Sequence, residues 1–292
     1  MIHRTASIDS DARIEPGVQI GPYCHIGPGV LISAGSRLAT HVVVERDTRI
    51  GRDCQVYSHA VIGSDPEDLR YQGQPSYLEI GDRTIIREFV TINRGCHGTA
   101  ITRVGSDCLF MKGSHIGHDC QVGDHVILAA LATLGGHIIV EDRVVIGGLA
   151  AMHQFIRIGT MAMVGGTAGV MQDVPPYCMV QGAPPATVRG LNRIGLVRNG
   201  VSDEGLTALK HSYRLMFRRS MTRNEALDEI ERLVELTPEV KHFVEFCRNA
   251  SKTGICKPEP SSGLGVVGST GSAGKAKPAL STEEPSGQTA QG

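Results

Sequence analysis

The stretch VGSDCLFMKGSHIGHDCQVGDHVILAALATLGGHIIV, residues 104–140, places an apolar residue at every sixth position. We call these residues the hexad core positions: Val104, Phe110, Ile116, Val122, Leu128, Leu134 and Val140. The same spacing reaches back to Ile2 and forward to Val170. A fixed period this short is typical of a parallel β-helix built from hexapeptides. Three hexads close one triangular coil, so the sequence predicts a mainly β fold.

The composition agrees with a thin prism of stacked coils about 4.8 Å apart. Glycine makes up 36 of 292 residues, tryptophan is absent and aromatic residues are only 4%. We expect glycine at the corners, because it accepts a positive φ without steric cost. Cys24, Cys54, Cys108 and Cys120 each lie four residues after a core position. We predict that they pack as small apolar side chains and bind no metal.

Two stretches interrupt the spacing. Residues 63–77 (GSDPEDLRYQGQPSY) and 94–103 (RGCHGTAITR) place Asp68, Gln74 and Gly98 where an apolar residue is expected. The phase of the repeat survives both. We predict that they are loops outside the helix, where repeat proteins often carry their functional residues.

Three segments follow from the pattern: a β-helix domain over residues 1–188, a helical domain over 189–250 and a disordered tail over 251–292. In the second segment Ser202, Thr222 and Thr237 are suited to cap three helices, with Glu225 completing a capping box and Pro238 at a first helical position. The last segment is dominated by Ser, Gly, Pro, Thr and Ala, which bury too little surface to fold.

A net charge of −1 gives no indication of a nucleic-acid partner. No apolar run approaches the length of a membrane-spanning helix, and the first residues lack the apolar stretch of a signal peptide. We therefore expect a cytoplasmic protein with no stable membrane insertion.

The register brings histidines together. Ile116, Leu134 and Met152 are separated by three hexads each and should stack on one face of three successive coils. His118, Gly136 and Gln154, two residues after each, should then form a column with about 4.8 Å between neighbours. The same strip also holds His115, His137 and His153.

A histidine in such a strip is suited to act as a general base near neutral pH, and a backbone N–H at Gly135-Gly136 is suited to stabilise an oxyanion. No serine or cysteine stands where a nucleophile would be needed, which favours direct acyl transfer. Two alternatives stay open: a zinc site using His118 and His137, and solvated corner histidines with no catalytic role.

The segments GSHIGHDCQVG, LATLGGHIIV, GGLAAMHQFIRIG and GGTAGVMQDVPPY, together with the hexads, resemble the UDP-N-acetylglucosamine 3-O-acyltransferases that begin lipid A synthesis. The resemblance runs from Ile2 to about Asn249. It implies a left-handed β-helix, a homotrimer with sites between subunits, and no cofactor beyond the phosphopantetheine of acyl carrier protein.

The resemblance also implies roles for catalytic residues. His118 matches the general base that deprotonates the sugar 3-hydroxyl for attack on an acyl-carrier-protein thioester. Gly136 matches the glycine whose N–H holds the oxyanion. Asp119 matches a residue that orients the base, which requires a corner geometry because adjacent strand residues point apart.

Further positions match substrate-binding residues of the family: Asp68, His115, His137, His153 and Gln154 for the substrate, Arg198 for a phosphate, and Gly166 for the length of the acyl chain. The sequence departs from the family at two points. Arg70 stands in place of the usual lysine, and Asn93 stands in place of a frequent histidine. Glycine at 166 leaves room for a long acyl chain.

We therefore predict an acyltransferase that moves a (3R)-hydroxyacyl group from acyl carrier protein to the 3-hydroxyl of UDP-N-acetylglucosamine. Three other functions are weighed against it. These are N-acylation of a 3-amino sugar, a zinc lyase similar to the γ-type carbonic anhydrases, and a module that binds carrier protein without turnover.

Overall fold

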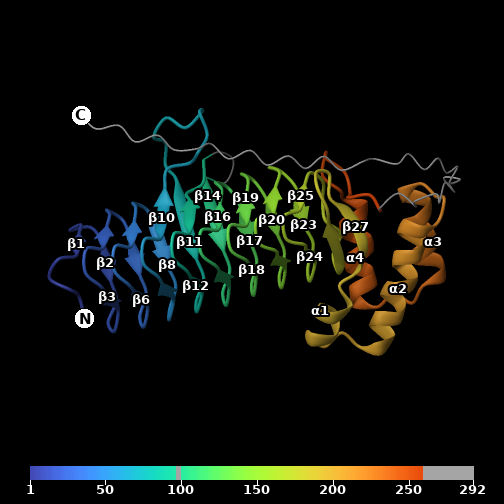
Figure 1. Ribbon diagram of the computed structural model, residues 1–292, viewed down its shortest axis with the longest axis horizontal. Helices are drawn as coiled ribbons and strands as arrows, with labels where there is room; N and C mark the ends of the chain where they lie inside the picture. The colour runs from blue at the N-terminus through green and yellow to red at the C-terminus, as the bar shows by residue number, and fades with distance from the viewer. Residues whose placement is uncertain (97–99, 259–292) are drawn as a thin grey trace, which may run out of the picture. The chain divides into compact units, whose positions relative to one another are not determined.

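The computed structural model describes residues 1–96 and 100–258, and these form a parallel β-helix followed by α-helices (Figure 1). The β-helix has three sheets, one per side of the prism. The first holds nine described strands: β1 (Ser7–Ile8), β4 (His25–Ile26), β7 (Val43–Val44), β10 (Val61–Ser64), β13 (Thr91–Asn93), β16 (His115–Ile116), β19 (Thr133–Leu134), β22 (Ala151–Met152) and β25 (Gly169–Val170).

The other two sheets have the same pattern of short parallel strands, apart from one antiparallel strand at the end of the last sheet. One comprises β2 (Arg13–Ile14), β5 (Leu31–Ile32), β8 (Thr48–Ile50), β11 (Tyr77–Ile80), β14 (Ile101–Val104), β17 (Gln121–Val122), β20 (Ile139–Val140) and β23 (Arg157–Ile158). The other comprises β3 (Gln19–Ile20), β6 (Arg37–Leu38), β9 (Gln55–Val56), β12 (Ile85–Ile86), β15 (Leu109–Phe110), β18 (Ile127–Leu128), β21 (Val145–Ile146), β24 (Met163–Val164), β26 (Cys178–Gln181) and β27 (Thr187–Leu191).

The predicted register is confirmed. Ile116 pairs with Leu134, and Leu134 pairs with Met152, so each regular coil takes three hexads. The apolar core positions from Ile20 to Val170 are buried, whereas Ile2 at the open end of the prism is exposed. Cys24, Cys54, Cys108 and Cys120 are buried, as predicted. Each strand therefore adds one apolar side chain to a continuous column, which no coil could bury alone.

The prediction of glycine at the corners holds only in part: Gly17, Gly29, Gly35 and Gly113 have a positive φ there, but other residues take the same conformation. Nineteen of the described residues other than glycine have a positive φ, and nearly all of them lie three residues after a core position. Tyr23, Phe89 and Leu131 are among them, although a bulky side chain raises the energy of this conformation. The corner N–H groups gain hydrogen bonds to the neighbouring coil, as from His137 N to the His118 carbonyl (2.9 Å). The repeat therefore imposes the left-handed conformation whatever side chain is present.

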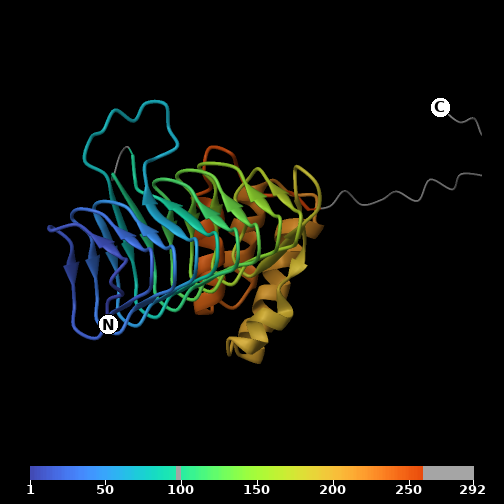
Figure 2. The same ribbon diagram turned by 60° about the vertical axis from the view of Figure 1, so that its left-hand side comes forward.

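The first interruption is a loop between β10 and β11 that projects from one corner of the prism (Figure 2). Ile62 pairs with Ile92, five hexads further on instead of three, so this loop adds two hexads to its coil. Ile80 pairs with Val104, four hexads further on, so the second interruption adds one. Both insertions are whole hexads, which explains why the phase survives. Residues 97–99 of the second loop, including Gly98, lie outside the described residues.

β26 still pairs parallel with β24, and the chain then leaves the β-helix through an antiparallel pairing of β26 with β27. The three predicted helices are α2 (Asp203–Arg218), α3 (Arg223–Leu233) and α4 (Pro238–Arg248), capped by Ser202, Thr222 and Thr237 as predicted. Glu225 completes the capping box. A short helix, α1 (Arg193–Arg198), precedes them and was not predicted.

Residues 251–258, which the sequence assigns to the tail, pack against the last coils. Asp173 is fully buried and accepts hydrogen bonds from Ser251 N and Ser251 Oγ, both at 2.7 Å. Ile255 forms a bridge to Asp173, and Cys256 is buried. The predicted disorder of residues 259–292 concerns a part of the chain outside the described residues.

Within residues 1–96 and 100–258, no helix combines the length and apolar character needed to cross a membrane.

Candidate active site

His118 and Asp119 form a hydrogen-bonded pair at one corner of the β-helix. The His118 Nδ1 atom lies 2.8 Å from Asp119 Oδ2, and both side chains are largely buried. Asp119 has a φ of 60°, the left-handed corner conformation. This conformation turns the Asp119 side chain back toward its neighbour, whereas two successive residues of a strand would point apart. The corner geometry that the pairing requires is therefore present.

Asp119 is held from the backbone side as well. Its Oδ2 atom accepts a hydrogen bond from Cys96 N (2.9 Å), and its own N–H donates to Thr102 Oγ1 (2.8 Å). A carboxylate fixed in this way favours the His118 tautomer with the proton on Nδ1, because Nδ1 then donates to Asp119. The Nε2 atom of His118 is left as the proton acceptor.

Gly136 lies directly against the His118 ring. A Cβ atom built on Gly136 would lie 2.7 Å from both Cε1 and Nε2 of His118, closer than real side chains approach. Only glycine therefore fits beside the imidazole in its present position. Among the described residues, the Gly136 N–H donates to no backbone carbonyl, so it is available to a ligand.

His137 completes the cluster one coil away. Its ring stands edge-on to His118 at 5.0 Å between centroids and stacks on Phe155 at 4.6 Å. Burial lowers the pKa of His137, and the Asp119 carboxylate opposes this shift only in part. His137 is thereby favoured in its neutral form, which is able both to donate and to accept a hydrogen bond.

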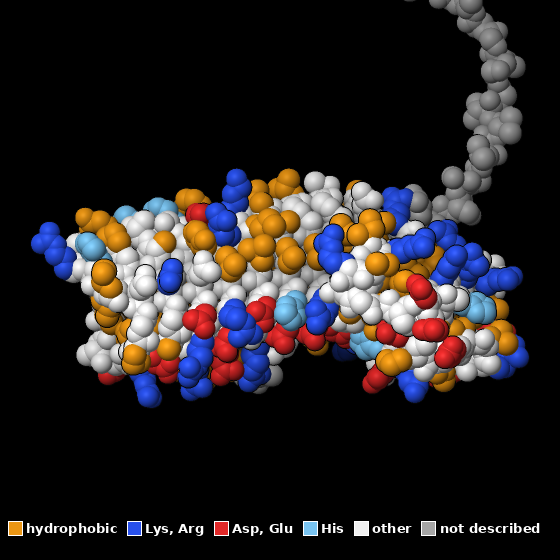
Figure 3. All heavy atoms as spheres, turned by 90° about the horizontal axis from the view of Figure 1, so that it is seen from below, with side chains coloured by type: hydrophobic (Ala, Val, Ile, Leu, Met, Phe, Trp, Pro, Cys, Tyr) orange, Lys and Arg blue, Asp and Glu red, His pale blue; other side chains and the backbone are white. Residues whose placement is uncertain are grey.

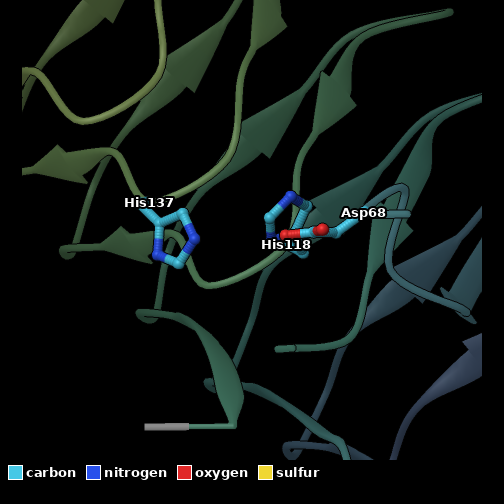
Figure 4. A group of neighbouring side chains, drawn as sticks. All are labelled: Asp68, His118 and His137. Atoms are coloured by element: carbon cyan, nitrogen blue, oxygen red, sulfur yellow. The ribbon is translucent and has the colours of Figure 1, made fainter. Parts of the chain in front are cut away.

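Asp68 reaches this cluster from the loop between β10 and β11 (Figure 4). Ligand atoms of Asp68, His118 and His137 lie within 4.8 Å of one another, which raises the question of a metal ion. Both oxygens of Asp68 are, however, already bound by Arg70, with Nε at 3.0 Å from Oδ1 and Nη2 at 2.6 Å from Oδ2. The Arg70 guanidinium holds the pKa of Asp68 well below its usual range. A cation at this place would have to share the Asp68 carboxylate with the Arg70 guanidinium, whose positive charge opposes its binding.

The remaining predicted residues of the strip lie along the same corner. His115 precedes the core position in β16, and its Nδ1 atom lies 2.8 Å from Thr91 Oγ1. Burial lowers the pKa of His115. His153 and Gln154 are exposed one coil beyond Gly136, with His153 Nδ1 3.0 Å from the Gln154 carbonyl oxygen.

Two predicted residues are not brought to this cluster within one chain. Arg198 is the last residue of α1 and is exposed. Figure 1 shows α1 on the opposite edge from the loop that carries Asp68. Gly166 follows β24, on a different corner from His118, where a Cβ atom would lie 3.3 Å from the Gly148 carbonyl oxygen.

The sequence did not identify the residues that contact Asp119, His137 and the Asp68 loop and hold them in place. Cys96 and Thr102 hold Asp119, and Phe155 stacks on His137. Arg94 is buried beneath the Asp68 loop. The one available signal was Arg94, a charged residue at the first position of the second interruption.

Comparisons with known proteins agree with this geometry. The model described as "Udp N-acetylglucosamine O-acyltransferase; Domain 2" matches residues 173–256, and the model of bacterial transferase hexapeptides matches residues 1–34 and 101–136. The acyl-[acyl-carrier-protein]–UDP-N-acetylglucosamine O-acyltransferase of Thermodesulfovibrio yellowstonii is 47% identical over 257 residues, which cover 88% of this chain and 99% of that protein. This chain belongs to the acyl-carrier-protein–UDP-N-acetylglucosamine O-acyltransferase family.

Solved structures of the family have the same fold. LpxA from Acinetobacter baumannii is 40% identical with a TM-score of 0.85, covering 88% of this chain and 99% of its own. The UDP-N-acetylglucosamine acyltransferase from Bacteroides fragilis is 35% identical with a TM-score of 0.86, covering 88% and 100%. The predicted left-handed β-helix is confirmed by this match, although the usual handedness of parallel crossovers is right-handed.

Proposed function

We propose that this protein transfers a (3R)-hydroxyacyl group from acyl carrier protein to the 3-hydroxyl of UDP-N-acetylglucosamine, with His118 as the general base. Transfer of an acyl group to UDP-N-acetylglucosamine, the first step of lipid A synthesis, is the activity of the family to which the chain belongs. The observation that carries the role of His118 is its Nδ1 hydrogen bond to Asp119, which leaves Nε2 as the proton acceptor on a ring packed against Gly136.

The proposed reaction proceeds by direct transfer. His118 Nε2 takes the proton of the sugar 3-hydroxyl as the oxygen attacks the thioester carbonyl carbon. The carbonyl oxygen gains negative charge, and the Gly136 N–H is suited to donate to it. Collapse of the intermediate breaks the carbon–sulfur bond, and the phosphopantetheine thiolate recovers the proton from the His118 imidazolium. No cofactor is needed, because the thioester supplies the activated acyl group.

Asp119 supports both halves of this cycle. Its carboxylate fixes the tautomer of the resting imidazole and stabilises the imidazolium that forms during attack. We propose sugar or acyl contacts for Asp68, His115, His137, His153 and Gln154, and a diphosphate or carrier contact for Arg70.

The other functions weighed from the sequence are less well supported. The relatives are named for O-acyl transfer or for UDP-N-acetylglucosamine, which favours a hydroxyl over a 3-amino acceptor. The relatives are named for acyl transfer to UDP-N-acetylglucosamine, which favours this reaction over a zinc lyase.

We further propose a homotrimer in the cytoplasm, in which a neighbouring chain supplies Arg198 and the acyl-length position Gly166. Support comes from a ridge on the corner that also carries Gly166. Tyr23, Phe89, Leu131 and Leu149 are exposed there, between 52% and 61%. Rings along this ridge stack at about 5 Å from Tyr23 through His41 and His59 to Phe89. Figure 3 shows apolar side chains in a band along one face of the β-helix, with a charged band beside it.

The proposal is tested by mass spectrometry of the product formed from UDP-N-acetylglucosamine and a panel of 3-hydroxyacyl carrier proteins. We expect a mass gain of one hydroxyacyl group with wild-type protein and a 10²–10⁴-fold lower rate with His118→Ala. The matched control is His125→Ala, because His125 is an exposed corner histidine on another side of the prism. A His118→Ala variant that keeps more than a tenth of the wild-type rate would show that His118 is not the base.

A further inference from the structure

The two interruptions of the repeat are joined beneath the active site by one buried side chain. Arg94 follows β13 and is only 1% exposed, the largest fully buried side chain among the described residues. Burying a guanidinium is costly unless each of its donors finds a partner. The contacts that compensate for its burial therefore indicate what Arg94 holds in place.

Those contacts all lie on residues 63–76, which comprise the end of β10 and the loop between β10 and β11. The Arg94 guanidinium donates to the Gly63 carbonyl and to the Asp65 carboxylate, and its Nε lies 3.3 Å from Ser76 Oγ. Both ends of the loop, residues 63–65 and 76, are therefore fixed to one side chain. The neighbouring Asn93 adds a 2.5 Å hydrogen bond from Nδ2 to the Asp65 carbonyl.

A further contact links Arg94 to the residue that enters the active site. Arg94 Nη2 lies 3.4 Å from the Tyr71 hydroxyl, and the Tyr71 N–H donates to the Asp68 carbonyl at 2.9 Å. Asp68 itself is bound by Arg70 and lies within 4.8 Å of ligand atoms of His118 and His137. Releasing Tyr71 and the loop ends would free Asp68 to move away from His118.

The backbone after Arg94 also reaches the catalytic pair. Two residues later, the Cys96 N–H donates to Asp119 Oδ2, the same oxygen that faces His118 Nδ1. The segment from Asn93 to Cys96 thus contacts the Asp68 loop at one end and the Asp119 carboxylate at the other. Its conformation affects both groups.

We propose that Arg94 is a positioning residue for the sugar nucleotide: it fixes the Asp68 loop over His118 and so sets the affinity for UDP-N-acetylglucosamine. This inference rests on the proposed function, in which Asp68 contacts that substrate. Arg94 itself is buried under the loop and touches no reacting atom.

The test compares Asp65→Asn, Tyr71→Phe and Arg94→Met. The Asp65 side chain is 70% exposed, so its replacement leaves the core intact and removes only the charge that faces Arg94. Arg103→Met is the control for the loss of an exposed arginine in the same stretch of chain, because Arg103 lies in β14 and pairs with Glu79 at 3.3 Å on the surface. For each variant, KM and kcat are measured by product formation, and Kd for UDP-N-acetylglucosamine is measured by calorimetry.

We expect Asp65→Asn and Arg94→Met to raise KM and Kd at least tenfold and Tyr71→Phe to raise them about threefold, with Arg103→Met unchanged. The Asp65→Asn, Arg94→Met double variant should resemble Arg94→Met alone. A purely structural role would reduce the folded fraction, which lowers apparent kcat but leaves KM unchanged. Unchanged KM and Kd in Asp65→Asn and Tyr71→Phe would overturn the inference even if Arg94→Met fails to fold.

The two proposals fail in different ways. If the wild-type protein binds UDP-N-acetylglucosamine but does not acylate it, the proposed function fails while the Kd values still decide the role of Arg94. If Arg94 has no positioning role, the wild-type protein turns over normally and the loop variants match it.

Discussion

Replacing Gly136 with alanine should show whether catalysis needs His118 in its present position, because the variant keeps the histidine but moves its ring. The added Cβ atom would lie 2.7 Å from Cε1 and Nε2 of His118, whereas ordinary contacts begin at 3.4 Å. The ring must therefore retreat by about 0.7 Å, the difference between the two values. The neighbouring backbone has little freedom to yield, because His137 N and Phe155 N are both hydrogen-bonded within this corner column.

A retreat of that size disturbs the 2.8 Å hydrogen bond to Asp119 and moves Nε2 away from the attacking hydroxyl. A misplacement near 1 Å typically costs about 10²-fold in rate. We therefore expect kcat to fall about 10²-fold in Gly136→Ala, with KM for UDP-N-acetylglucosamine changed less than threefold. The Gly136 N–H is retained in this variant, so the loss reports on His118 and not on the oxyanion donor.

The assay is steady-state product formation by mass spectrometry, together with the melting temperature of each variant. Gly136 has no positive φ, so alanine imposes no backbone strain there. Gly190→Ala is the control: it lies in β27, also without a positive φ, and a Cβ atom there meets nothing within 4 Å. A Gly136→Ala protein that melts like wild type and loses less than threefold in kcat would refute the close packing of His118 as a requirement for catalysis.

Three further predictions concern Asp119, His115 and Asp173. Asp119→Asn keeps the shape of the side chain but allows an amide N–H to face His118 Nδ1, which favours the wrong tautomer, so kcat should fall at least 10²-fold in the product assay. Burial lowers the pKa of His115 below its unfolded value of about 6.5, so the unfolded state binds more protons below that pH. The unfolding free energy should keep its full value above about pH 6.5 and fall as the pH drops below it. His115 contributes at most about 1.4 kcal/mol per pH unit to this fall. Urea titrations of His115→Gln should therefore show a shallower decline of the unfolding free energy with falling pH. Asp173→Ala removes a buried acceptor of two hydrogen bonds from Ser251 and should lower the unfolding free energy by about 3 kcal/mol, measured by denaturant titration, with a near-normal kcat in the folded protein.

The column of His118, Gly136 and Gln154 was predictable because it depends only on the period. A repeat of three hexads per coil fixes which residues stack, without knowledge of any side-chain contact. The period also predicted the buried cysteines. The three helices were predictable because their capping residues lie next to them in the sequence.

The contacts that depend on irregular backbone were not predictable. The ion pair between Asp68 and Arg70 forms within an inserted loop, whose conformation the repeat does not determine. The hydrogen bonds of Arg94 to Gly63 and Asp65 connect the second interruption to the first, and these residues are far apart in the sequence. Arg198 and Gly166 could be assigned roles only through the family, because neither lies beside His118 in one chain.

Backbone strain does not mark the active site in this protein. A positive φ at a residue other than glycine often indicates function, yet among the described residues nineteen of them recur along the prism. Asp119 shares its conformation with Asp53, Asp107 and many others, so the turn that brings Asp119 onto its neighbour is available at most corners. What distinguishes this corner is the choice of side chains: a histidine before the aspartate, and a glycine one coil away that leaves room for the imidazole. A regular scaffold therefore supplies the geometry of a catalytic pair repeatedly, and the sequence makes one copy reactive.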